Sequence, residues 1–176
     1  LVDACVVGVV RNATGWVDAA CNAKGISTDE PIAAEEILAG PTTLLRYLRL
    51  LSGVLRDIEQ HGKPKLPAQL RRNSLGRTCV PILPVRSLFD SMIFMGLKAE
   101  VWLQADANDE SLFTDTFSIA DSEPAKVAGI LGAGNVSAIP ATDMLYKIFH
   151  DREAVLLKLN IPLKKWLLKV SPIHLF

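Results

Sequence analysis

The chain has no excess charge of either sign, because 19 basic and 19 acidic residues cancel. Nucleic acids and anionic membranes attract proteins largely through positive charge, so this balance argues against both as partners. Long apolar runs are also missing. The segment from Leu1 to Val10 is too short and too interrupted to span a bilayer, and no basic segment precedes it. We therefore expect no membrane anchor and no signal peptide, and a cytoplasmic location.

Cysteine is scarce. The three cysteines, Cys5, Cys21 and Cys79, are odd in number and share no spacing typical of a metal site. This pattern predicts no metal centre. We expect three buried thiols in a reducing compartment, with one reactive thiol as the alternative.

What the chain does contain is ordinary globular material, with 49% apolar and 22% charged residues. Composition and pattern divide it into a helical region (1–64), a strand-containing segment with a polar connection (65–124), a βαβ unit (125–160) and an atypical tail (161–176). The chain opens on Leu1 rather than Met. We therefore expect the true N-terminus to lie upstream and the chain to be a fragment of a longer protein.

The first region reads as consecutive helices. Apolar positions in residues 1–24 recur loosely at helical spacing, and Gly25 is a suitable stop. A capping box that pairs Ser27 with Glu30 predicts the start of a short helix ending at Leu38, with Asp29 as a rival cap.

The strongest helical pattern runs from Thr42 to Gln60. Its apolar residues step by four, three, four and three positions: Leu44, Leu48, Leu51, Leu55 and Ile58. This spacing predicts an amphipathic helix. Its apolar stripe is expected to pack on its own domain, with packing between subunits as the alternative.

The second region changes to strand pattern. Two strands, 68–72 and 77–81, flank a turn at Asn73–Gly76. A short helix at 85–95 and another strand at 99–104 follow. The polar connection from Ala105 to Pro124 carries only a weak helical pattern, at Leu112–Phe117.

The run Val127–Pro140 reads as a buried strand, a glycine turn and the start of a helix, and Ala154–Asn160 as a second strand. Strand, helix and strand in this order predict a βαβ unit, on which dinucleotides are often bound. Pro140 fits the first helical position, and Asp143 is expected in the first turn, where it suits the helix dipole.

The turn Gly132-Ala133-Gly134 nearly fits the G-x-G-x-x-G fingerprint of dinucleotide-binding folds. The third glycine is replaced by Ser137, and Lys158 stands near the place of the acidic residue that contacts ribose. A lysine there would donate to ribose hydroxyls or to a 2′-phosphate. The alternative is a plain tight turn between strand and helix.

Asn135 follows the first strand, at the carboxyl edge where open α/β sheets bind ligands. Its side-chain amide is suited to donate to a developing oxyanion. The alternative is an asparagine chosen for a left-handed turn conformation.

With these residues in place, the chain resembles the aldehyde dehydrogenase superfamily, in particular a bacterial aldehyde-dehydrogenase-like branch. The matching stretches are 131–140, 143–149 and 155–160, with support from 16–25, 38–41, 48–51 and 99–102.

The resemblance implies an α/β fold: N-terminal helices, a short β-hairpin and the first βαβ unit of an incomplete Rossmann-type domain. It implies an NAD(P)-dependent oxidoreductase that oxidises a small aldehyde through a cysteine thiohemiacetal, with NAD or NADP as cofactor. Asn135 corresponds to the oxyanion-binding asparagine and Lys158 to the ribose-binding lysine, with Gly132, Ala133 and Gly134 in the cofactor turn. A homo-oligomer is expected at full length.

The catalytic cysteine and the general-base glutamate of the family would lie after Lys158, outside this chain. The fragment alone is therefore expected to be inactive. Ala133-Gly134 departs from the family's Pro-Trp, and Ile161-Pro162 stands where a glutamate often selects NAD, so the choice between NAD and NADP stays open. Two alternatives remain: an acyl-CoA or acyl-thioester reductase of the same superfamily, and a non-catalytic assembly module.

Overall fold

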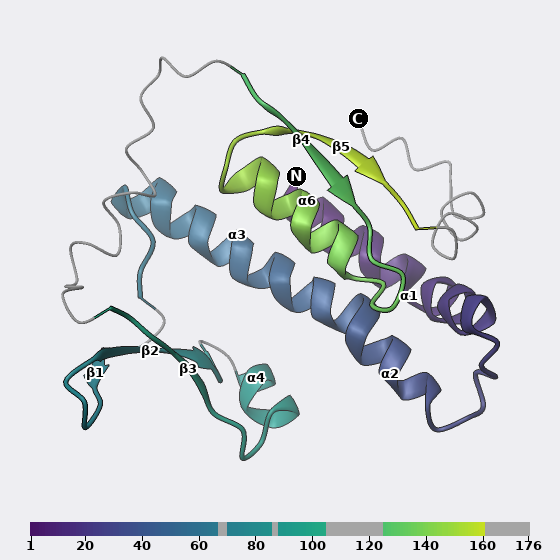
Figure 1. The fold of residues 1–176 in the computed structure, drawn as a ribbon, viewed down its shortest axis with the longest axis horizontal. Coiled ribbons are helices and arrows are strands. Elements are labelled where there is room, and N and C mark those ends of the chain that lie inside the picture. Colours follow the sequence, from purple (N-terminus) through teal and green to yellow (C-terminus); the bar gives the residue numbers. More distant parts are fainter. Residues whose placement is uncertain (67–69, 86–87, 105–124, 161–176) are drawn as a thin grey trace. The chain divides into compact units, whose positions relative to one another are not determined.

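The computed structural model describes residues 1–66, 70–85, 88–104 and 125–160 (Figure 1). These residues form two compact units. The first contains Leu1–Gly53 and the described residues after Glu123, and the second contains the described residues of Val54–Ser122. Helices and sheets occur together, so the α/β class is confirmed in its broad sense.

The first unit begins with helix α1, Val2–Lys24, as the sequence predicts. Gly25 ends it in a left-handed conformation with a φ of 70°. A residue with a Cβ adopts that conformation at a cost, so glycine is well suited to this position.

The next helix is shorter than expected, and it runs into a kink. Helix α2 spans Ala33–Ile37 and continues into η1, Leu38–Thr42, where Gly40 leaves helical geometry. Half of the predicted capping box is present, because the backbone N–H of Ser27 donates to Glu30 Oε1 at 3.1 Å. The hydroxyl of Ser27 instead accepts from the N–H of Asp29.

Helix α3, Thr43–His61, agrees with the predicted helix to within one residue at each end. Leu44 and Leu48 on its apolar stripe are buried, while the later members of the stripe are half-buried. The stripe therefore packs on the chain itself along its first two turns. Gly62 follows with a φ of 74°.

The second unit holds a three-stranded antiparallel sheet in the order β1-β2-β3, formed by Arg71–Arg72, Thr78–Leu83 and Ala99–Trp102. The predicted hairpin is confirmed: Asn73 Oδ1 accepts from the N–H groups of Leu75 and Arg77 and so closes the turn. Helix α4, Leu88–Ile93, is shorter than the expected 85–95. The connection 105–124, with its weak helical pattern, lies outside the described residues.

The first unit closes with a strand, a helix and a strand in the predicted order. The prediction that the first of these strands is buried is wrong, because Ile130 is its one buried residue and Val127 and Leu131 are 72% and 78% exposed. Strands β4, Val127–Leu131, and β5, Ala154–Lys158, are parallel, and helix α6, Ile139–Phe149, connects them and packs on both (Figure 1). The register pairs Val127 with Ala154 at one end and Leu131 with Lys158 at the other.

Two details of α6 differ from expectation. Pro140 is its second residue rather than its first, and the first turn holds no acidic residue because Asp143 lies further along the helix. The expected interaction of Asp143 with the positive end of the helix dipole is therefore wrong, since that effect fades beyond the first turn. Within the described residues, no helix has the length and apolar character needed to cross a bilayer.

Candidate functional site

The candidate turn, residues 132–138, connects the end of β4 to the start of α6. It lies at the carboxyl end of both parallel strands, since Leu131 and Lys158 are the last register pair. The backbone N–H of Gly132 donates to the carbonyl of Lys158 at 2.8 Å. The predicted residues are thus brought together: Gly132, Ala133, Gly134 and Asn135 in the turn, and Lys158, with an exposed side chain, beside it.

Gly132 is closely packed against the backbone of β5, and Gly134 lies against the side chain of Asn160. A Cβ on Gly132 would lie 3.1 Å from Pro140 Cγ and 3.2 Å from the carbonyl oxygen of Lys158. A Cβ on Gly134 would lie 2.7 Å from Asn160 Nδ2. These approaches are what a tight turn between strand and helix requires, with or without a ligand.

Asn135 is exposed, and it is not in the left-handed conformation. Among the described residues, Arg152 is the only non-glycine residue with a positive φ. The alternative that explained Asn135 by a left-handed turn is therefore wrong. The backbone carbonyl of Asn135 accepts from Lys24 Nζ at 2.7 Å, and its side chain remains at the surface.

The turn also presents backbone donors. Within the described part of the chain, no backbone carbonyl accepts from the N–H groups of residues 133–137. These groups immediately precede the first turn of α6, where the partial positive charge of a helix is concentrated. Such an arrangement suits an anion, and phosphate groups of nucleotides commonly bind there.

Residues of the N-terminal helices also contact the turn. The indole N–H of Trp16 donates to Ser137 Oγ at 2.8 Å in a buried hydrogen bond. The N–H of Ala138 donates to the carbonyl of Ala39 at 3.3 Å. Gly40 lies against the same place, because a Cβ there would be 2.9 Å from Ser137 Oγ.

Lys24 and Glu36 form a partly buried ion pair, and Lys24 also contacts the turn. Lys24 Nζ contacts Glu36 Oε1 in addition to the carbonyl of Asn135. The Glu36 side chain is 2% exposed and that of Lys24 is 27% exposed. Sequence reasoning missed Trp16, Lys24 and Glu36, because helical pattern alone does not reveal which distant turn a helix residue contacts.

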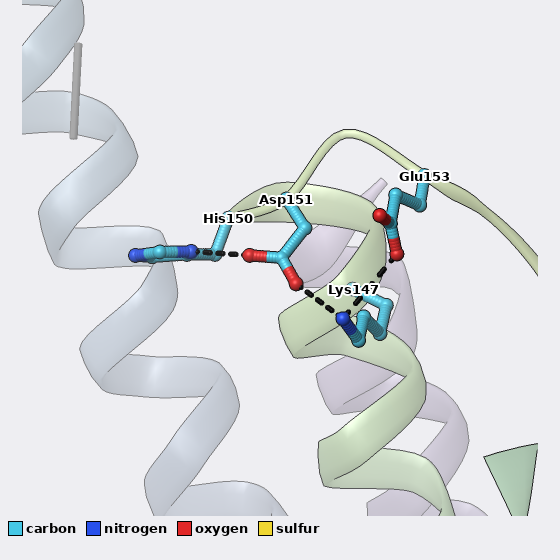
Figure 2. A network of polar contacts seen from close by, with 4 residues as sticks. All are labelled: Lys147, His150, Asp151 and Glu153. Atoms are coloured by element: carbon cyan, nitrogen blue, oxygen red, sulfur yellow. Dashed lines mark hydrogen bonds and ion pairs between the residues drawn. The ribbon is translucent and has the colours of Figure 1, made fainter. Parts of the chain in front are cut away.

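A second polar cluster lies at the other end of α6 (Figure 2). Lys147 Nζ lies 2.6 Å from Asp151 Oδ2 and 3.3 Å from Glu153 Oε2, and His150 Nδ1 lies 2.7 Å from Asp151 Oδ1. The ring of Tyr146 stacks on that of His150 at 4.5 Å between centroids. This cluster precedes β5, so it is at the amino end of the strand and not at the candidate turn.

The ion pairs of this cluster shift two pKa values. The hydrogen bond from Lys147, followed by that from His150, lowers the pKa of Asp151 below its ordinary value. The hydrogen bonds to Asp151 and Glu153 raise the pKa of Lys147. Both groups are therefore held in their charged forms.

The surroundings of Cys21 and Cys79 differ from those of a catalytic cysteine. Cys21 and Cys79 are buried, and burial is the main cause that raises the pKa of each thiol; nearby Glu36 adds to the effect at Cys21 and Glu100 at Cys79. A raised pKa leaves little thiolate at neutral pH. The prediction of buried thiols is confirmed for these two, and it is wrong for Cys5, which is half-buried on α1.

Among the described residues there is no group of three or more histidine, cysteine or acidic side chains that could hold a metal ion. No protein family, curated protein or solved structure matches this chain.

Proposed function

We propose that this chain supplies the first dinucleotide-binding element of an NAD(P)-dependent, aldehyde-dehydrogenase-like oxidoreductase. The observation that carries the proposal is the pairing of Leu131 with Lys158 on parallel strands joined by α6. This pairing brings a turn whose N–H groups have no backbone acceptor among the described residues next to an exposed lysine, at the sheet edge where α/β folds bind nucleotides.

Each residue has a definite role in this proposal. The N–H groups of residues 133–137 bind the diphosphate of NAD or NADP, and Lys158 donates to the adenosine ribose or its 2′-phosphate. The exposed amide of Asn135 donates to the carbonyl oxygen of the aldehyde, which becomes an oxyanion when a cysteine thiolate attacks the carbonyl carbon. NAD or NADP, when bound to these residues, would supply the hydride acceptor.

The nucleophile is not assigned to this chain. Cys21 and Cys79 are buried with raised pKa values, and Cys5 lies near the start of α1. We therefore expect residues 1–176 to bind nucleotide without oxidising an aldehyde. Turnover of an aldehyde with NAD or NADP by the purified chain would contradict this assignment.

The nucleotide site is tested by titrating the chain with NAD and NADP and following backbone amide signals by NMR. Signals of the candidate turn should shift, and Lys158→Met should weaken binding by about 10-fold or more, as expected for loss of one hydrogen bond from a charged donor. Lys147→Met is the matched control, because it removes a lysine at the opposite end of α6 and should leave the affinity unchanged.

A non-catalytic scaffold is the second candidate, and the packing of Gly132 favours it, because a Cβ there would meet Pro140 and the backbone of Lys158 whether or not a ligand is bound. The same titration separates the two. Absence of shifts in residues 132–138 at millimolar NAD and NADP would leave the scaffold as the better account. An acyl-thioester reductase uses the same site, so it is distinguished by assaying aldehydes and acyl-CoA side by side in a protein that also supplies the nucleophile.

A further inference from the structure

The ammonium group of Lys24 joins three parts of the first unit. It projects from the last turn of α1, contacts the Glu36 carboxylate of α2, and donates to the carbonyl of Asn135 at 2.7 Å. It therefore fixes the direction in which one peptide group of the candidate turn points.

The opposite side of that peptide group is what a ligand would meet. In a trans peptide the C=O of one residue and the N–H of the next point in opposite directions. Because Lys24 holds the carbonyl of Asn135 on the side of α1 and α2, the N–H of Val136 points away from these helices. This N–H is one of the donors without a backbone acceptor in the described residues.

The position of Glu36 is explained better by its contact with Lys24 than by a contribution to the free energy of unfolding. Its side chain is 2% exposed, and its Oε2 atom has no hydrogen-bond partner among the described residues. A buried carboxylate with one unsatisfied oxygen is costly, and a buried ion pair commonly adds little or nothing to net stability. An arrangement that costs stability points to a role in orientation.

Neighbouring contacts act on the same turn in the same way. Trp16 holds the hydroxyl of Ser137, and the carbonyl of Ala39 holds the N–H of Ala138. Residues 135, 137 and 138 are thus each tied to the N-terminal helices. Of these three contacts, the one to the peptide between Asn135 and Val136 is made by a charged side chain.

We infer that Lys24 and Glu36 are positioning residues, which orient the Asn135–Val136 peptide so that the Val136 N–H donates to an anionic ligand. The anion is the diphosphate of a nucleotide, and in this respect the inference rests on the proposed function. The orientation of the peptide itself does not depend on any ligand.

The test uses the whole chain with four variants: Lys24→Met, Lys24→Arg, Glu36→Gln and the control Lys147→Met. In Lys24→Met, the amide signal of Val136 should move, because the ammonium group that holds the carbonyl of Asn135 is gone and the peptide is free to rotate. Signals of β4 and β5 should stay in place. Lys24→Arg should restore the signal, Glu36→Gln should give an intermediate shift, and Lys147→Met should change nothing at Val136.

The affinity for NAD is measured on the same samples. It should fall about 10-fold in Lys24→Met, and recover in Lys24→Arg. An unchanged Val136 signal in Lys24→Met would overturn the inference. So would a Lys24→Met variant that loses the signals of the whole unit together, if Glu36→Gln leaves Val136 unmoved while its β4 and β5 signals stay in place.

Failure of the proposed function gives a different result. If the unsubstituted chain binds neither NAD nor NADP while Lys24→Met still moves Val136, the peptide is positioned as inferred but does not serve a nucleotide.

Discussion

The two ends of helix α6 differ in the contacts that stabilise them. At its start, the candidate turn is tied to residues far away in the sequence, with separations of 111 positions for Lys24 and Asn135 and 121 for Trp16 and Ser137. At its end, the turn into β5 is tied by neighbours, with separations of four for Lys147 and Asp151 and one for His150 and Asp151 (Figure 2).

Burial also differs between the two ends, although Lys24 at 27% exposure is close to Asp151 at 24%. Trp16 and Glu36 are 4% and 2% exposed, while the side chains of Lys147 and His150 are 37% and 47% exposed. Buried polar contacts are costly to break, whereas exposed ion pairs are screened by water and salt. The start of α6 therefore depends on the whole first unit, and its end is locally self-sufficient.

Removing the buried indole tests this comparison most strongly. Trp16→Ala should lower the free energy of unfolding by about 3–5 kcal/mol, because it opens a large cavity and leaves the Ser137 hydroxyl unpaired. Urea unfolding followed by circular dichroism measures this. Trp102→Ala, in which the indole is 53% exposed, should cost less than about 1 kcal/mol. Equal losses in the two variants would break the comparison.

A smaller effect is expected from a single added methyl group. Gly40→Ala would place a Cβ 2.9 Å from Ser137 Oγ and 3.4 Å from Trp16 Nε1, inside the buried hydrogen bond. It should cost about 1–3 kcal/mol through overpacking. Gly15→Ala, within α1 and with no atom within 4 Å of the new Cβ, should instead stabilise the chain by about 0.5–1 kcal/mol. A stabilising Gly40→Ala would show that the turn and the N-terminal helices are loosely joined.

The smallest effect concerns the exposed end of α6 and its dependence on pH. The pKa of Asp151 is lowered from 3.8 by Lys147 and His150. The contribution of Asp151 to the free energy of unfolding is thus fully present above pH 3.8. It is lost as the pH falls through the lowered pKa of the folded chain, because the unfolded chain binds the proton first.

Urea midpoints measured between pH 5 and pH 2 test this dependence. Asp151→Asn should flatten the fall in the midpoint in that window, and added salt should reduce the difference between the variant and the original chain. Asp29→Asn, which changes an exposed carboxylate before α2, serves as the control. A fall unchanged by Asp151→Asn would show that the cluster in Figure 2 contributes nothing to stability.

Most of the elements were predictable because each depends on a local pattern. The helix ending at Gly25, the apolar stripe of α3 and the hairpin around Asn73 follow from periodicity and turn chemistry. The βαβ order followed from two apolar runs separated by a glycine turn and a helix. The predicted ends of α2 and α4 were less accurate. The kink at Gly40 and the packing of the chain decide where these short helices end.

The candidate site was predictable only in part. Parallel strands that share an edge bring the turn and Lys158 together, and sequence order was enough to expect this. The partners of the turn were not predictable. Glu36 has the pattern of an exposed acid on a short helix, and nothing in its neighbourhood indicates that it is buried behind a turn about 100 residues later.

The sequence by itself determined where helices and strands form and which strand ends share an edge, since hydrogen bonds between near neighbours and the alternation of apolar residues act over a few positions. Only the tertiary structure decided that Trp16, Lys24 and Glu36 hold the turn before α6. The physical reason is that packing brings distant residues together through the shape of the whole unit, and no local pattern encodes that shape.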